Sequence, residues 1–186
     1  VIAQVPVWWV LMLPLGVVLI FLFTLNHEAI LRTAFAAGWL NEVVTRVCAL
    51  VLILPATWFR FFHFEHHRHT QDPERDPELA GTAPATRAAW LWHVSGIPLW
   101  ISAIKGLLTN AAGLNRDPFV PASARAGVQR EALAMIAVYL GLLATSLWLQ
   151  TAVLLWVWVI PGLLGQPFLR LYLLAEHGRC AFVANM

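Results

Sequence analysis

Two long runs of the chain, residues 1–27 and 132–169, contain no Asp, Glu, Lys or Arg. A helix needs about 20 apolar residues to span the hydrocarbon core of a bilayer. The first run therefore predicts one crossing over residues 5–25. The second run is too long for one crossing and predicts two, over 132–149 and 151–171.

The predicted hairpin turns at Gln150–Thr151, and Trp148, Trp156 and Trp158 flank the turn as interface anchors. All charged residues lie outside the two uncharged runs. They therefore gather after the end of the first predicted crossing and at the ends of the hairpin helices remote from the turn.

Two further segments are apolar but interrupted. Residues 42–62 contain Arg46 and Pro55, and the uninterrupted part of the segment is short. Short apolar runs are more typical of interfacial or re-entrant segments than of full crossings, so we expect this segment to dip into the membrane and return. Residues 88–112 predict an amphipathic helix pair on the membrane surface, broken by Gly96, Pro98 and Lys105.

The composition agrees with an all-α integral membrane protein, and the length with a single domain over residues 1–186. The chain is 60% hydrophobic and 12% charged, against about 25% charged in soluble proteins, and its mean hydropathy is +0.70. The net charge of +2 is too small to indicate a nucleic acid partner. Cys48 and Cys180 match no metal-binding or redox spacing and are interpreted as buried thiols.

Residues 62–79, FHFEHHRHTQDPERDPEL, carry the strongest chemical signal. His63, His66 and His67 have the i, i+3, i+4 spacing that places side chains on one helix face. Neutral imidazoles gathered in this way are ligands for Fe, Zn, Cu or Ni, but not for Mg or Ca. His69 lies off this face, and His93 lies in the surface segment, so both are interpreted as solvated or interfacial.

His27 and His177 occupy similar places, each at the charged end of an apolar helix. If residues 42–62 crossed the bilayer, His27 and His63 would lie on opposite sides of it. A dip brings all five histidines to one side, where ionisable residues at the membrane edge indicate a functional site.

These motifs resemble the membrane fatty acid desaturases, a family of histidine-box proteins. The first box reads HEAIL followed by RTAF, the second reads HFEHH with its tail RHTQDPERDPEL, and LRLYLLAEHGRC resembles the region that supplies a later histidine. The resemblance covers nearly the whole chain, and the second box is its most specific part.

The resemblance implies an oxidoreductase that introduces a double bond into an acyl chain, with O2 as oxidant and a histidine-bound diiron centre. It further implies an acyl-lipid substrate, an external ferredoxin- or cytochrome-type electron donor, and transmembrane helices under a cytoplasmic cap that holds the irons. The expected location is the bacterial inner membrane. The implied metal ligands are His27, His63, His66, His67 and His177.

The chain departs from the family pattern at two points. Leu31 stands where the first box should have a second histidine, and the chain contains no second HxxHH. We therefore expect the site to be incomplete within these 186 residues, and this chain alone to be inactive.

Three other functions fit parts of the pattern. One is an acyl or carotenoid hydroxylase or ketolase of the same superfamily, and another is a non-catalytic remnant. A metal transporter is less compatible, because residues 132–169 hold almost no polar groups. A zinc protease is excluded because HEAIL lacks the second histidine of HExxH. The acidic loop Asp72 to Glu78 either orients the ligand histidines or is a solvated turn.

Overall fold

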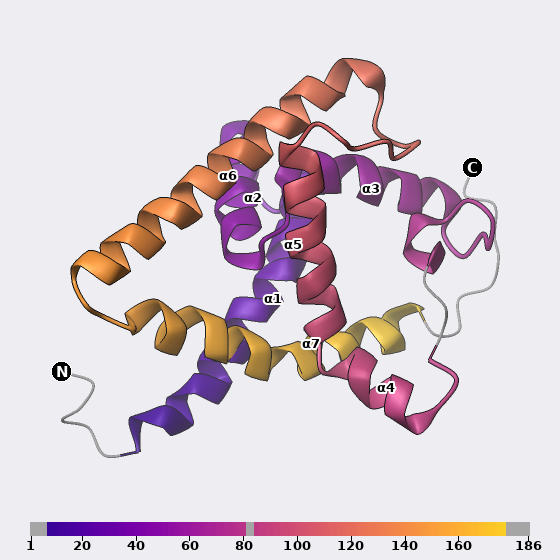
Figure 1. The fold of residues 1–186 in the computed structure, drawn as a ribbon. Coiled ribbons are helices and arrows are strands. Elements are labelled where there is room, and N and C mark those ends of the chain that lie inside the picture. The colour runs from indigo at the N-terminus through magenta and orange to yellow at the C-terminus, as the bar shows by residue number, and fades with distance from the viewer. Residues whose placement is uncertain (1–6, 81–83, 178–186) are drawn as a thin grey trace.

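A computed structural model describes residues 7–80 and 84–177, and of residues 175–177 the backbone alone. All regular secondary structure in this part of the chain is helical (Figure 1). In chain order the elements are the 3-10 helix η2 (Trp8–Leu11), α1 (Met12–Leu31), α2 (Gly38–Leu52), α3 (Ala56–His69), the 3-10 helix η3 (Pro77–Ala80), α4 (Arg87–Val94), α5 (Ile97–Ala111), α6 (Ala122–Trp148), the π-helix η4 (Leu155–Val159) and α7 (Ile160–His177).

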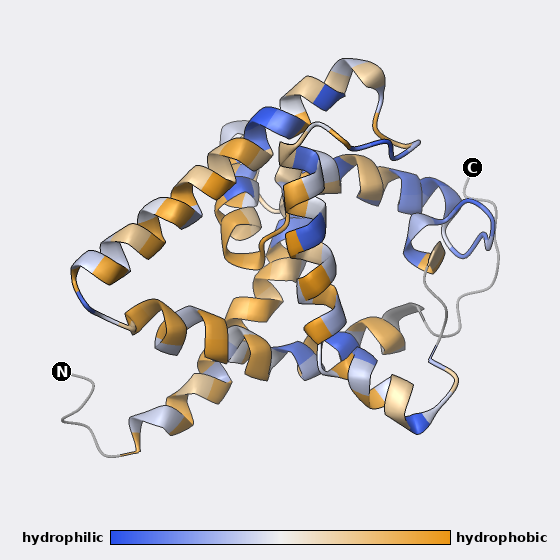
Figure 2. Cartoon of the chain, in the orientation of Figure 1, coloured by the Kyte–Doolittle hydropathy of each residue, from blue (hydrophilic) through white to orange (hydrophobic). Residues whose placement is uncertain are grey.

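Three helical segments are long and apolar enough to cross a membrane: Trp8–Leu31, Ala122–Trp148 and Leu155–Leu174. Two bent helix pairs raise the number to as many as five. The predicted all-helical membrane architecture is confirmed, and Figure 2 shows apolar residues along α1, α6 and the first part of α7. The helix that contains the predicted crossing over 132–149 begins ten residues earlier, at Ala122. Arg125 and Arg130 lie in its first turns, because charged residues outside the bilayer extend a helix readily.

Glycines let α1 and α7 pack backbone against backbone. A Cβ atom on Gly16 would overlap the carbonyl of Pro161, and one on Gly165 would overlap the carbonyl of Gly16. Further along both helices, the rings of Phe21 and Tyr172 lie 5.7 Å apart. The two helices therefore run in the same direction, and their C-terminal ends point to the same side of the molecule.

After α1 the chain reverses direction, and α2 runs back along α1 before the chain turns again into α3. α2 and α3 meet at an angle of 98° across a break at residues 53–55, where Ile53 adopts a left-handed conformation. The last carbonyls of α2 have no partner within the helix. Tyr139 donates to the Leu50 carbonyl at 2.8 Å, and Trp158 donates to the Val51 carbonyl at 2.8 Å.

Both donors lie on candidate crossing segments, so two of the last carbonyls of α2 are satisfied beside these segments, as a non-aqueous environment would require. α3 then returns to the end of α1, where the rings of His27 and His63 lie 4.4 Å apart. This proximity confirms that His27 and His63 lie on the same side, because a full crossing would separate them by about 30 Å. The entry of α2 into the membrane stays a prediction.

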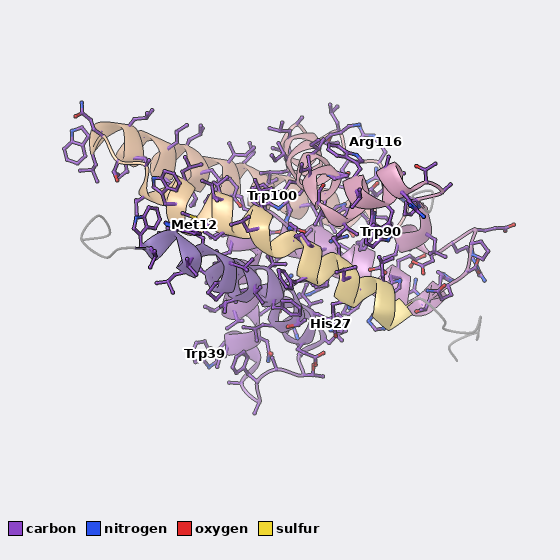
Figure 3. The ribbon with its side chains drawn as sticks, turned by 90° about the horizontal axis from the view of Figure 1, so that it is seen from below. Met12, His27, Trp39, Trp90, Trp100 and Arg116 are labelled. Carbon is purple, nitrogen blue, oxygen red and sulfur yellow. The ribbon has the colours of Figure 1, made fainter. Side chains whose placement is uncertain are left out.

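α4 and α5 form the predicted helix pair, bent by 57°. Gly96 at the bend has a positive φ of 70°, and a Cβ atom there would overlap the side chain of Gln166 on α7. Trp100 on α5 lies beside α7 (Figure 3), against Gly162. The position of this pair on the membrane surface stays a prediction.

Candidate metal centre

Helix α3 places two histidines of the HxxHH motif on one side of the site. His63 and His67 are one helical turn apart, and their Nε2 atoms lie 2.9 Å apart. His63 is buried and stacks on Phe59, with ring centroids 5.3 Å apart. Since Phe59 also contacts Phe23 of α1 at 5.7 Å, aromatic packing fixes α3 against the end of α1.

The last turn of α1 supplies the third histidine. His27 lies toward the end of α1 that is remote from Met12 (Figure 3). Its ring centroid is 4.4 Å from that of His63 and 5.7 Å from that of His67. One nitrogen from each of the three rings lies within 4.8 Å of the other two.

This geometry fits a transition metal. Imidazole nitrogens bind such ions at about 2.0–2.1 Å, so two nitrogens on one ion are about 3–4 Å apart. The three nitrogens lie within 4.8 Å of one another, and those of His63 and His67 are 2.9 Å apart, so small side-chain movements would bring all three to one ion. An all-nitrogen donor set favours Fe, Zn, Cu or Ni.

Glu28 determines which nitrogen His27 offers to the site. Its carboxylate accepts from His27 Nδ1 at 3.0 Å, which leaves Nε2 with a lone pair for a metal. Thr33 holds the carboxylate in place by donating to its other oxygen at 2.6 Å. The sequence analysis missed this role, although the HE pair in HEAIL was the available signal.

His66 has partners of its own. Its Nδ1 lies 2.9 Å from Oδ1 of Asp76 and its Nε2 3.5 Å from Oε2 of Glu78. The backbone N–H groups of Gln71 and Glu78 also donate to Asp76. The ring of His66 is 6.1 Å from that of His63 and points toward the acidic loop, so it does not join the triad in this conformation.

The acidic loop therefore has both of the expected roles: one residue orients a histidine and another forms a turn. Asp76 is buried and orients His66. Asp72 is part of a turn, in which the backbone N–H of Glu74 and the guanidinium of Arg75 hold the pKa of the Asp72 carboxyl below its ordinary value.

The other predicted positions lie as follows. Leu31 is the last residue of α1 and is partly buried. His177 ends the backbone of α7, and its side chain lies outside the described residues, as does Cys180. Nε2 of His69 lies 3.4 Å from Glu65, and His93 is partly buried on α4.

An apolar cavity of about 70 Å³ lies between α1, the end of α2, α5 and α7. Its lining includes Leu19, Phe23, Trp100 and Leu169. Phe23 contacts Phe59, which stacks on His63, so two aromatic rings connect the cavity wall to the triad.

The structure has candidate membrane-spanning helices, and three imidazoles gather at the end of one of them. These features define a membrane protein that can bind a metal ion through histidine. The chain belongs to the fatty acid desaturase family, whose model matches residues 4–184. The earlier resemblance is thereby confirmed.

Two curated relatives are similar to part of the chain. Both are sn-1 oleoyl-lipid 12-desaturases. The protein from Picosynechococcus is 29% identical over 52% of this chain and 31% of its own length. The protein from Anabaena variabilis is 27% identical over 51% of this chain and 31% of its own length. The matches thus span about a third of these relatives, and no solved structure matches the chain.

Proposed function

We propose that this chain forms part of a membrane fatty acid desaturase that introduces a double bond into the acyl chain of a lipid. The observation that carries the proposal is the convergence of His27, His63 and His67 in a member of the desaturase family. Iron fits this site because its donors are imidazole nitrogens, and the family uses a diiron centre.

His27, His63 and His67 would hold one iron, and His66 and His177 would contribute to a second. Bound iron would activate O2 for C–H cleavage, a reaction that no side-chain acid or base can drive. The remaining residues position the ligands and exclude water. Glu28 and Asp76 orient His27 and His66 by accepting hydrogen bonds from their Nδ1 atoms.

The cavity is suited to a short saturated stretch of acyl chain, because most of its wall is hydrocarbon and aromatic, with Gln166 and Arg170 as its polar part. An acyl lipid in the bilayer lies beside the crossing helices and can enter between them without passing through water. The reaction also needs O2 and an external electron donor of the ferredoxin or cytochrome type. We place the histidines on the cytoplasmic face of a bacterial inner membrane, in a single domain.

A chimera tests this function. Residues 4–184 of this chain, which the family model matches, replace the corresponding residues of the Picosynechococcus relative, with Leu31 or with Leu31→His. We expect the Leu31→His chimera to form O2-dependent dienoic lipid from oleoyl lipid, measured by gas chromatography. The same chimera with His63→Ala should form none. If the Leu31→His chimera is present in membranes and binds iron but makes no product, this result would contradict the proposed reaction.

Leu31 favours a second candidate, a metal-binding protein without turnover. An apolar side chain at this position cannot bind iron and leaves His27 as the ligand contributed by α1. Iron binding without product in both chimeras would support this candidate.

A further inference from the structure

Helix α3 carries His63, His66 and His67, yet its packing against neighbouring helices is much sparser than that between α1 and α7. We propose that Glu131 and Asp117, far from the histidines in sequence, are positioning residues that fix α3 from its N-terminal end. This inference deepens the proposed function, because it names what aligns the metal-binding helix.

Glu131 fixes the start of α3. Its Oε2 accepts a hydrogen bond of 2.7 Å from the backbone N–H of Thr57. The first N–H groups of a helix have no acceptor within the helix, and a carboxylate at this end also interacts favourably with the helix dipole. Glu131 lies on α6, directly before the uncharged run that begins at residue 132. The bond therefore ties the histidine helix to a crossing helix.

Asp117 fixes the rotation of α3 about its axis. Its Oδ2 accepts a hydrogen bond of 2.7 Å from the indole Nε1 of Trp58. Asn115 donates to the same oxygen at 2.8 Å and to Asn110 at 2.6 Å. Asn110 and Asn115 are buried, so the acceptor of the Trp58 bond is itself held rigidly.

Rotation matters because neighbouring residues on a helix point in different directions. His63 and His67 face His27, whereas His66 faces Asp76. A small rotation of α3 would turn the first two away from His27. Asp76 restrains the C-terminal half of α3, and the Glu131 and Asp117 bonds restrain its first turn.

The test compares Glu131→Leu with Glu131→Gln, whose amide oxygen keeps an acceptor for Thr57. Gln129→Leu is the matched control, because Gln129 lies on the same helix and donates to the Ala111 carbonyl, at the end of α5, at 3.1 Å. Co(II) affinity is measured by optical titration of the purified chain, together with the thermal stability of the metal-free form.

We expect Glu131→Leu to lower Co(II) affinity about tenfold, within the range for lost outer partners of metal ligands. Glu131→Gln should stay within about threefold of the parent, and Gln129→Leu should lose stability without losing affinity. Equal affinity losses in Glu131→Leu and Gln129→Leu would overturn the proposal, as would an unchanged affinity in Glu131→Leu. If Glu131→Leu does not fold, Trp58→Phe removes the Asp117 bond and should lower affinity several-fold; an unchanged affinity there would equally overturn the proposal.

A distance measurement separates this proposal from the proposed function. Spin labels at Arg68 and Arg116, both exposed, report the position of α3 without metal, in a background with both cysteines replaced by serine. Glu131→Leu should broaden the distance distribution, and Glu131→Gln should not. If the parent binds no Co(II), the proposed function fails, and these distances still decide the positioning role, since identical distributions would overturn it.

Discussion

At the scale of single residues, carboxylates orient two of the histidines. Glu28 and Asp76 each accept from an Nδ1 atom, of His27 and His66 respectively. His27 thereby offers Nε2 to a metal with its ring orientation already fixed, whereas Nε2 of His66 lies 3.5 Å from Oε2 of Glu78.

Replacing Asp76 tests this role. Asp76→Ala should lower the affinity for a second Co(II) ion by about 10- to 100-fold, because His66, the proposed ligand of that ion, loses the acceptor that sets its orientation. Glu74→Gln, in the same loop but on its exposed surface, is the control and should bind like the parent. Parental affinity in Asp76→Ala, measured by optical titration, would show that His66 does not contribute to the metal site.

The sequence predicted part of this detail. Helical spacing predicted that His63, His66 and His67 share one face, whereas His66 turns toward Asp76 in the structure. Orienting the ligand histidines was one of the two roles expected for the acidic loop. The HE pair in HEAIL was a signal for the contact between Glu28 and His27, but the bond from Thr33 to Glu28 was not predictable, because it depends on how the chain leaves α1. Arg32 adopts a left-handed conformation there, and Thr33 then reaches back to Glu28.

At the scale of elements, the close approach of α1 and α7 sets where the end of each helix lies. Gly16 and Gly165 allow backbone contact between the two helices, as small residues commonly do in membrane helix pairs. His27 lies three turns beyond Gly16 on the same helix, so the crossing point fixes the depth of the site.

Gly16→Ala should destabilise the protein by about 1–3 kcal/mol, the usual cost of overpacking a well-packed interface. Gly141→Ala is the matched control, since nothing lies within 4 Å of the added Cβ on α6. Thermal unfolding in detergent measures both. Equal stability of the two variants would show that the α1–α7 contact is not tight.

Hydropathy predicted which elements cross, and Arg46 with Pro55 predicted the dip. Hydropathy did not predict that α1 lies beside α7, because this pairing joins segments far apart in the sequence. The start of α6 was also missed, because charge marks the edge of the bilayer and not the end of a helix.

At the scale of the whole molecule, the return of α3 to the end of α1 brings the histidines of the two helices together. Tyr139 and Trp158 make this return possible by satisfying two of the last carbonyls of α2. Residues at the ends of α1 and α3 must then lie on one side of the membrane, and the α6–α7 turn on the other.

Cysteine labelling in sealed, oriented vesicles tests this topology in a background without native cysteines. Single cysteines at Arg32 and Glu74 should react with an impermeant maleimide from the same side. A cysteine at Gln150, in the exposed turn after α6, should react from the opposite side. Labelling of Arg32 and Glu74 from opposite sides would contradict the re-entrant path.

The central claim is that His27, His63 and His67 bind one metal ion together, and it is tested most directly by Fe(II) and Co(II) titration of single alanine variants in detergent. We predict that His27→Ala, His63→Ala and His67→Ala each lose more affinity than the 10- to 100-fold typical of an outer partner. His69→Ala, next to the triad but paired with Glu65, should bind like the parent. Parental affinity in any of the three triad variants, or loss in His69→Ala alone, would contradict the account.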